Sequence, residues 1–220
     1  MQVIKAGYEI MDPLNGMEIL KKIEQVARVC YKSEDKITEG SAVKMVRALI
    51  KNNHLAMLEH FSFSVKFIVD RGVSHEIVRH RVSSFAQEST RYCNYGTKSG
   101  EITVIEPCYL SDPTKDDWYK KYTAWESACM EAEECYLLML DAGATPQEAR
   151  AVLPTSLKTE IVMTANLREW RHFFNLRACG ATGKPHPQML EVAVPLLQEL
   201  KDRIPVVFDD LEPLEVGCDG

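Results

Sequence analysis

The chain has 220 residues, of which 45% are hydrophobic and 26% charged, and its formal net charge is -6. This length and composition are typical of a globular protein with a substantial core, most simply a single domain over residues 1–220. The negative charge disfavours a broad electrostatic surface for nucleic acid, so we expect a small anionic ligand in a local basic pocket.

Cysteine usage and hydropathy indicate the cellular compartment of the protein. An odd number of cysteines without a CxxC pair disfavours both a zinc ribbon and a complete disulfide framework. The seven cysteines are at positions 30, 93, 108, 129, 135, 179 and 218. The first residues lack the apolar run of a signal peptide, and no apolar segment is long enough to span a bilayer. We therefore expect a cytoplasmic protein without a membrane partner.

The first part of the chain predicts a strand, two helices and a second strand. Gln2–Met11 is typical of a strand, and residues 16–31 and 41–53 carry apolar side chains at helical spacing. Apolar and polar residues alternate from Phe61 to Val69, which predicts a half-buried strand. Asp70-Arg71-Gly72 is expected to end this strand.

A polar region follows. Residues 73–81 predict a short helix, which leads into residues 79–92. That stretch is too polar and too aperiodic for the core, so we expect a loop there.

The second half of the chain predicts a long helix. Asp112 as N-cap and Pro113 at the first helical position indicate its start, and an apolar stripe from Trp118 to Met139 continues it. Such a stripe is more often packing than a cofactor site, so this helix receives no catalytic role.

Four further elements complete the pattern. Thr145-Pro146-Gln147-Glu148 is a capping box that predicts a helix, which Pro154 ends. The remaining predictions are a strand over 159–166 and helices over 166–177 and 186–205, the last with an internal proline. The expected fold class is mixed α/β (α+β), rich in helix.

The stretch RHRVSSFAQESTRY, from Arg79 to Tyr92, concentrates cations and hydroxyl groups in an acidic chain. Forked guanidinium groups and hydroxyl donors are what a phosphate needs. A Walker motif is absent from the sequence, so a triphosphate site of that type is not indicated. The stretch therefore predicts a pocket for a smaller phosphate compound.

Local spacing argues against a metal. His75 and His80 are five residues apart, about 140° around a helix, whereas zincin histidines are four apart and point the same way. His54 and His60 lack a third ligand at a recognisable spacing. The sequence predicts no metal site.

Nucleophilic catalysis has only weak support. Cys93 follows the polar stretch, which itself contains Ser83, Ser84 and Ser89, but neither a GxSxG elbow nor a local cysteine signature accompanies them. A lone serine is usually a hydrogen-bond donor.

Helical angles suggest that some arginines serve different ligands or different subunits. Arg79 and Arg81 would point about 200° apart if both were helical. Arg168 and His172 share one face of their predicted helix, while Arg177 lies about 180° from Arg168.

Ordinary structural roles explain the same residues equally well. Asn166 and Glu169 form a good N-cap pair, and Arg177 near a helix end complements the helix dipole. For Arg168 and Arg171 the ordinary role is that of a charged side chain on the surface.

The stretch at residues 79–92 resembles the signature of a known family. The RHRxxSxNExSxRY signature of the flavin-dependent thymidylate synthases is matched by Arg79, His80, Arg81, Ser84, Ser89, Arg91 and Tyr92. Other family segments resemble ARVCY at 27–31, LEH at 58–60, EARAVLP at 148–154 and N-x-R-x-x-x-H-F-x-x-L-R at 166–177. The chain therefore resembles the family over nearly its whole length. It departs from the family at Ala56, usually Ser or Thr, at Ala86, usually Asn, and at Gln87, usually Glu.

The resemblance implies a reaction, a fold and an assembly. The reaction is reductive methylation of dUMP to dTMP in de novo dTMP biosynthesis, with 5,10-methylenetetrahydrofolate as methylene donor and FADH2, regenerated by NADPH, as hydride donor. The fold is a helix-rich domain around a small, mostly antiparallel sheet. The assembly is a homotetramer whose active sites are shared between subunits.

The resemblance also implies roles for individual residues. Arg177 would be the catalytic cation, because a guanidinium stays charged beside an electron-rich uracil. The implied dUMP contacts are Glu76, Ile77, Val78, Arg79, Gln87, Glu88, Ser89, Thr90, Arg91, Arg150 and Arg177, with Arg91 and Arg150 nearest the phosphate. The implied FAD contacts are Arg79, His80, Arg81, Gln87, Asn166, Leu167, Arg168 and His172. Ser89 is expected to orient the substrate rather than to act as a nucleophile.

Two alternatives stay open at the level of sequence. One is a non-catalytic nucleotide-binding or flavin-binding protein on the same scaffold, which the departures at Ala56, Ala86 and Gln87 allow. The other is a metal-independent nucleotide hydrolase that uses Ser89 or Cys93. Neither alternative needs FAD for a reaction, which distinguishes both from the enzyme, and the folate pocket has no motif of its own.

Overall fold

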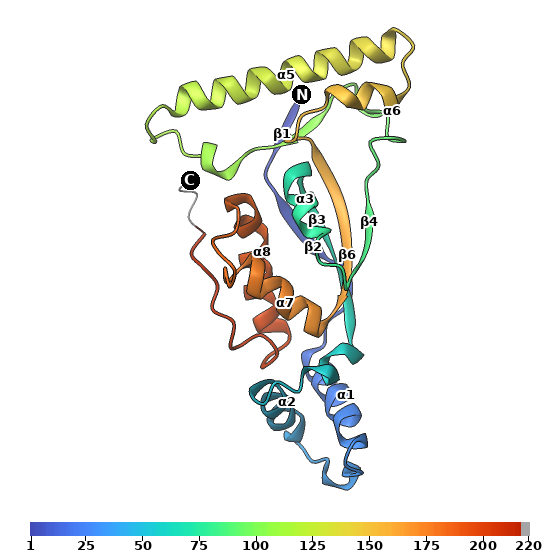
Figure 1. Ribbon diagram of the computed structural model, residues 1–220, viewed down its shortest axis with the longest axis vertical. Coiled ribbons are helices and arrows are strands. Elements are labelled where there is room, and N and C mark those ends of the chain that lie inside the picture. The colour runs from blue at the N-terminus through green and yellow to red at the C-terminus, as the bar shows by residue number, and fades with distance from the viewer. Residues whose placement is uncertain (217–220) are drawn as a thin grey trace.

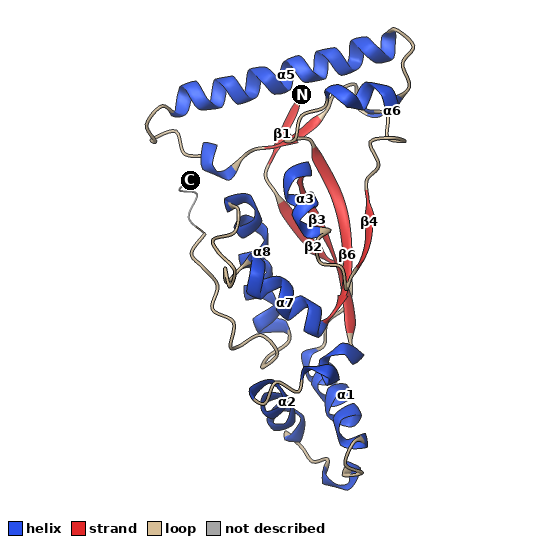
Figure 2. Ribbon diagram, viewed as in Figure 1, coloured by secondary structure: helices blue, strands red, loops and turns tan. Residues whose placement is uncertain are grey.

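The computed structural model describes residues 1–216, so Cys218 lies outside the described residues. Helices and strands are interspersed along the chain (Figures 1 and 2). The strands are β1 Gln2–Ile4, β2 Gly7–Ile10, β3 Ser62–Asp70, β4 Ser84–Gln87, β5 Thr103–Ile105 and β6 Lys158–Asn166. The α-helices are α1 Gly16–Val29, α2 Ser41–Lys51, α3 Arg71–Ile77, α4 Tyr95–Lys98, α5 Trp118–Asp141, α6 Pro146–Ala149, α7 Leu167–Arg177 and α8 Pro187–Arg203. Short 3-10 helices are η1 Glu34–Lys36, η2 Leu55–His60, η3 Cys108–Leu110 and η4 Arg150–Val152.

A four-stranded antiparallel sheet forms the centre, in the order β2-β3-β6-β4. β3 and β6 pair along their whole length, from Ser62 opposite Asn166 to Asp70 opposite Lys158. The alternation that predicted β3 is confirmed, because every second side chain from Phe63 onward is buried. These side chains pack against α7 and α8, which lie together beside the sheet (Figure 1). The mixed α/β class is therefore confirmed.

The expected strand Gln2–Met11 is wrong as a single element. β1 pairs in parallel with β5 in a separate two-stranded sheet, whereas β2 pairs with β3. The two halves also pack into different hydrophobic clusters: Val3 lies against the cluster under α5, and Tyr8 against the main core. Two packing partners therefore split a run that is continuous in sequence.

The expectation of a loop throughout residues 79–92 is also wrong in part. Ser84–Gln87 forms strand β4, which joins the sheet at its edge by pairing with β6. An edge strand has only one neighbour and one partly covered face, so it can be more polar than a central strand. Phe85 packs against the main core from this strand.

The long helix begins later than predicted. α5 starts at Trp118 and not at Pro113. The Asp112 carboxylate instead accepts hydrogen bonds from the main chain and the hydroxyl of Thr114, at 2.9 and 2.7 Å. This local turn competes with helix formation at a residue type that favours both.

Two hydrophobic clusters fill the molecule. The main cluster joins the central sheet to α1, α2, α7 and α8. The second lies under α5, around Cys129, Tyr136 and Leu157. None of the helices within residues 1–216 combines the length and the apolar character that crossing a bilayer requires.

Candidate active site

The site is built around the end of α3. The Asp70 carboxylate caps this helix by accepting from the Val73 main-chain N–H at 2.7 Å, so the helix begins at Arg71, directly after β3. It ends at Ile77, earlier than the predicted residue 81. Arg79 and Arg81 therefore lie beyond the helix, and the helical angle between them does not apply.

Arg177, the last residue of α7, is held by three contacts with the α3 region. Its Nη1 donates to the Glu76 carboxylate at 2.8 Å, and its Nη2 donates to the Glu76 carbonyl oxygen at 3.2 Å. Its Nε donates to Nε2 of His80 at 3.3 Å. Since a guanidinium carries five N–H groups, two remain for a ligand. The structure thus brings together three of the expected site residues.

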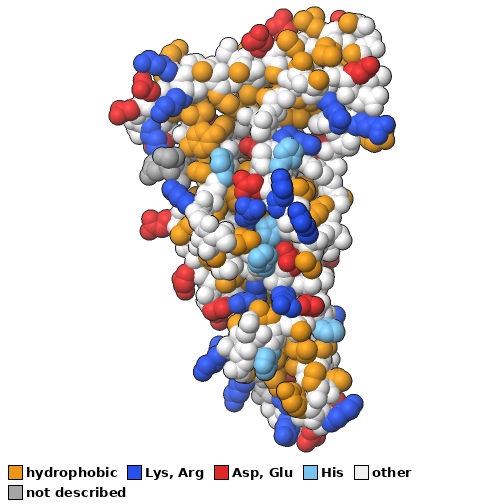
Figure 3. All heavy atoms as spheres, viewed as in Figure 1, with side chains coloured by type: hydrophobic (Ala, Val, Ile, Leu, Met, Phe, Trp, Pro, Cys, Tyr) orange, Lys and Arg blue, Asp and Glu red, His pale blue; other side chains and the backbone are white. Residues whose placement is uncertain are grey.

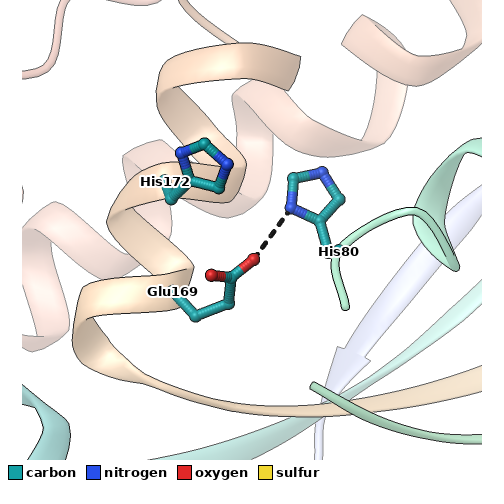
Figure 4. Close-up of side chains that lie close together, drawn as sticks. All are labelled: His80, Glu169 and His172. Atoms are coloured by element: carbon teal, nitrogen blue, oxygen red, sulfur yellow. Dashed lines mark hydrogen bonds and ion pairs between the residues drawn. The ribbon is translucent and has the colours of Figure 1, made fainter. Parts of the chain in front are cut away.

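His80, in the segment after α3, is buried against α7, with 3% of its surface exposed. Its Nδ1 lies 3.1 Å from a carboxylate oxygen of Glu169, as Figure 4 shows. Burial, followed by the nearby Arg177 and His172, lowers the pKa of His80 to about 4. Burial also raises the pKa of Glu169, although His172 opposes this. The contact has the length of an ion pair, but the low pKa of His80 keeps the imidazole neutral at neutral pH, so the contact is a hydrogen bond.

Gln87, the last residue of β4, contacts hydroxyl groups of α3 and β6. The Gln87 amide donates to Ser74 Oγ at 2.9 Å and to Thr159 Oγ1 at 3.3 Å. A carboxylate could not donate to these hydroxyl groups, which gives a structural reason for an amide at a position where the family signature has Glu.

Glu88 is held by two side chains that the sequence analysis missed. Its carboxylate accepts from the Tyr95 hydroxyl and from Lys158 Nζ, both at 3.1 Å. Burial and then Glu88 raise the pKa of Tyr95, so the hydroxyl keeps its proton as a donor. Arg71 Nη1 also reaches the Glu88 carbonyl oxygen, at 3.3 Å. Sequence reasoning treated Arg71 only as a strand end, although a cation beside a polar stretch was the available signal.

Arg91 contacts α6, the short helix that precedes Arg150. Arg91 Nε donates to the Gln147 side chain at 3.0 Å, and Gln147 lies in the helix that directly precedes Arg150. The Ser89 hydroxyl accepts from the Arg91 main-chain N–H at 3.3 Å, a local turn contact. The exposed side chain of Arg150 faces solvent.

A hollow runs along α7. It has a volume of about 610 Å³. Its lining residues are Leu55, Glu59, Val82, Asn166, Arg168, Glu169, Arg171, His172, Asn175, Asp210 and Leu211. Three expected FAD contacts, Asn166, Arg168 and His172, therefore line one cavity.

The polar side chains of this hollow have structural partners as well. Asn166 is the N-cap of α7 and accepts from the Glu169 main-chain N–H at 2.9 Å, as the N-cap prediction required. Arg168 Nη1 pairs with Glu59 at 2.5 Å. Arg171 makes a bidentate pair with Asp210 at 2.7 Å and is not a plain surface charge. The opposed directions of Arg168 and Arg177 are thus matched by partners within the same chain.

Other expected contacts lie in the core or at the surface. The side chains of Ile77 and Leu167 are fully buried, so only their main chains can reach a ligand. Val78, Arg79 and Arg81 are exposed, and Thr90 is half-buried. Lys, Arg and His side chains gather down the middle of the face shown in Figure 3, over α3 and α7.

Residues distant in sequence also form a potential metal-ligand group. Ligand atoms of His80, Glu169 and His172 lie within 4.8 Å of one another (Figure 4). Sequence reasoning about metals considered only neighbouring histidines, and Glu169 only as a partner in helix capping. Only the packing of α7 against the segment after α3 brings the three together.

Comparisons with known proteins agree with the resemblance. Residues 14–206 match the family described as Thymidylate synthase complementing protein. The chain is similar to proteins named flavin-dependent thymidylate synthase from three organisms. Identity is 30% with that of Geobacter sulfurreducens, over 87% of this chain and 80% of the relative. It is 32% with that of Pyrococcus furiosus, over 89% and 78%, and 33% with that of Corynebacterium efficiens, over 94% and 84%.

A solved structure shares the fold. It is a UMP/dUMP methylase, PolB, from Streptomyces cacaoi, bound with 5-Br dUMP. The TM-score is 0.78 and the identity 24%, with 95% of this chain and 96% of that chain covered.

Proposed function

The chain belongs to the Thymidylate synthase complementing protein family, and we propose that it catalyses the reductive methylation of dUMP to dTMP. The methylene group comes from 5,10-methylenetetrahydrofolate, and NADPH is the final reductant. We include in this proposal the cytoplasmic homotetramer with shared active sites that the resemblance implies.

Arg177 is the proposed catalytic residue. Methylation at uracil C5 needs an electron-rich ring, and a fixed cation beside the ring stabilises the charge that develops there. The contacts of Arg177 with Glu76 and His80 hold its guanidinium in one orientation, with two N–H groups left for the substrate. A donor fixed before the reaction costs little reorganisation during it.

The dUMP phosphate is proposed to bind near Arg91 and Arg150. Two guanidinium groups can take anionic oxygens in pairs, and the hydroxyl of Ser89 beside them suits an orienting donor. The only side-chain hydrogen bond of Ser89 among the described residues is the one it accepts from Arg91, so a base that would activate it as a nucleophile is not in place. Substrate contacts are proposed for Glu76, Ile77, Val78, Arg79, Gln87, Glu88, Ser89, Thr90, Arg91, Arg150 and Arg177.

The donor set of the hollow along α7 fits FAD. A cavity of about 610 Å³ is within the usual range for cofactor pockets, and a guanidinium, an amide and an imidazole line it. Asn166, Arg168 and His172 would hold the cofactor from α7, joined by Arg79, Arg81, Gln87 and the main chains of His80 and Leu167, whose side chains are buried. When bound and reduced by NADPH, FAD would supply the hydride.

The orientation of Arg177 is the single observation that carries the proposal. Its contacts with Glu76 and His80 hold a cation between α3, in the expected nucleotide segment, and the expected flavin helix α7. The first test is titration of the purified protein with FAD, followed by absorbance and flavin fluorescence. The second is dTMP formation with dUMP, methylenetetrahydrofolate, NADPH and FAD, and with each omitted in turn.

We expect uptake of FAD and dTMP formation that needs all four compounds. FAD uptake and dUMP binding without turnover would favour the non-catalytic alternative. Release of phosphate or base from dUMP without FAD would favour the hydrolase. A protein whose absorbance and fluorescence ignore FAD would end the flavoenzyme proposal.

A further inference from the structure

Four side chains form a continuous chain of contacts between α7 and the α3 region. Glu169 contacts His80, His80 contacts Arg177, and Arg177 contacts Glu76. Glu169 and His80 are 8% and 3% exposed. Glu169 has no role in the proposed chemistry so far, yet it is the buried end of this chain.

The contacts of His80 determine where its proton lies. A guanidinium can only donate, so Nε2 of His80 must accept the hydrogen bond from Arg177 Nε. The single proton of the neutral ring is then on Nδ1, where it is donated to the Glu169 carboxylate. Both partners of the imidazole therefore require the same tautomer.

We propose that Glu169 is a positioning residue: its carboxylate fixes His80 in the Nδ1–H tautomer, and the free lone pair on Nε2 then orients the guanidinium of Arg177. The inference rests on the proposed function, in which Arg177 is the cation beside the uracil ring. A histidine tautomer fixed by an acidic partner behind it is a common device in functional sites.

The opposite tautomer would disturb Arg177. A proton on Nε2 would face the Nε–H of Arg177 at 3.3 Å, leaving two donors opposed and unsatisfied. Glu76 would then be the only remaining partner, and the guanidinium could turn about its side-chain bonds. Because a fixed donor geometry supports the transition state more than ground-state binding, we expect this loss mainly in kcat.

A metal site is the competing interpretation of the same cluster. Two histidines and a carboxylate are a suitable donor set for a divalent transition metal. A metal on Nδ1 of His80 would displace the proton that the Arg177 contact requires there. The guanidinium adds an unfavourable positive charge next to such an ion, so the contacts favour positioning.

Three polar side chains and one aromatic ring surround His80. Glu169 and His172 approach from α7, Arg177 from its end, and the ring of Phe173 covers one edge at 4.9 Å between centroids. A change in the His80 signal can therefore be traced to one of three polar neighbours.

The test compares Glu169→Leu, which removes the acceptor, with Glu169→Gln, whose amide oxygen can still accept from Nδ1. Glu24→Gln is the matched control, since Glu24 is also a buried carboxylate with a side-chain partner, Arg28, but lies in α1. The first measurement is 15N NMR of histidine-labelled protein without FAD, with the His80 signal assigned from the His80→Asn difference. The second is kcat and the dUMP KM of each variant per folded, FAD-loaded site.

We expect Nδ1–H in the wild type, in Glu169→Gln and in Glu24→Gln, and a substantial Nε2–H fraction in Glu169→Leu. We expect kcat to fall about 10- to 100-fold in Glu169→Leu with a smaller change in KM, and to be largely restored in Glu169→Gln. Wild-type His80 protonated on Nε2, or kcat unchanged in Glu169→Leu, would overturn the inference.

Three further outcomes have a definite meaning. If Zn²⁺ added to the unloaded protein shifts the His80 and His172 signals together at stoichiometric concentration, the cluster is a metal site and the positioning role is wrong. If the NMR result holds but the wild type makes no dTMP, the tautomer contact stands while the proposed function fails. If Glu169→Leu does not fold, the wild-type and Glu169→Gln spectra still decide the tautomer.

Discussion

At the scale of single residues, Arg177 and Arg150 carry the same charge in different surroundings. Arg177 is clamped by Glu76 and His80, whereas the side chain of Arg150 is exposed. We predict that Arg177→Lys lowers kcat by roughly 100-fold or more, because lysine lacks the planar fork that is fixed for the transition state. Arg150→Lys should mainly weaken dUMP binding, by about 1.5–3 kcal/mol for each lost charge-assisted hydrogen bond.

The measurement is kcat and dUMP affinity for both variants at saturating FAD and folate. Thermal stability of each variant is the control, because Arg177 also lies at a helix end. Equal kcat in Arg177→Lys and wild type, with only the melting temperature lowered, would leave Arg177 a structural charge.

Glu191 is a second residue whose surroundings predict behaviour. It lies on α8 with one carboxylate oxygen that is buried and lacks a hydrogen-bond partner among the described residues. Burial, then Glu106 and Asp70 against the opposing Lys5, raise the pKa of Glu191 from 4.5 to about 7. Between these pH values the folded chain keeps a proton that the unfolded chain has lost. The free energy of unfolding therefore falls as pH rises from 4.5 to 7.

We predict that Glu191→Gln raises the free energy of unfolding by roughly 1–3 kcal/mol at pH 8 and changes it little at pH 4.5, since one pKa unit corresponds to about 1.4 kcal/mol. Urea unfolding at the two pH values measures the difference. Asp202→Asn, at an exposed position of the same helix, is the control. A gain of equal size at both pH values would show that the pKa of Glu191 is not raised in the folded chain.

At the scale of elements, α7 combines a local start signal, the N-cap Asn166, with proposed ligand positions. Asn166 caps the helix through its side-chain oxygen, which leaves its amide N–H groups for a ligand. We predict that Asn166→Ala costs about 1 kcal/mol of stability, or a melting temperature lower by about 2–4 °C. Asn166→Asp should keep the cap but lose FAD affinity, because aspartate cannot donate.

Thermal melts without FAD and FAD titrations of both variants separate the two roles. If Asn166→Asp binds FAD as tightly as the wild type, Asn166 serves the helix alone. A loss of FAD affinity in both variants, with the melting temperature lowered only in Asn166→Ala, is the expected pattern.

At the scale of the whole molecule, we propose that residues 1–220 are a single domain despite two hydrophobic clusters. β1 and β2 are joined directly and belong to different sheets, which ties the clusters together. Trp170 lies in the main core, whereas Trp118 and Trp125 lie on α5. A Trp118→Phe, Trp125→Phe double variant should therefore show the same unfolding midpoint by Trp170 fluorescence and by far-UV circular dichroism. Two midpoints would mean that the α5 layer unfolds separately.

The proposed shared active site is also a property of the whole assembly. Arg91 lies by the proposed phosphate site and Arg168 by the proposed flavin hollow. If these parts come from different subunits, co-expressed Arg91→Ala and Arg168→Ala chains will form some intact sites. We predict partial recovery of dTMP formation in such mixtures when each variant alone is inactive. Light scattering should then give four chains of 25.0 kDa per particle. Recovery in no mixture would place the complete site within one chain.

Local sequence patterns determined much of this protein. The alternation in β3, the capping box before α6 and the Asn166 cap of α7 each depend on residues within a few positions of one another. Those patterns predicted the right elements because steric and hydrogen-bonding preferences over short separations do not depend on the rest of the fold. The spacing of the arginine-rich stretch likewise pointed to the correct family.

Only the tertiary structure decided the partners. The division of residues 2–10 between two sheets and the pairing of Ser84–Gln87 with β6 both differ from the prediction. The contact between His80 and Glu169 joins residues 89 positions apart. Choice of strand partner and burial of a polar pair depend on which surfaces meet when the chain closes on itself, and a local pattern carries no information about distant segments that compete for the same contact.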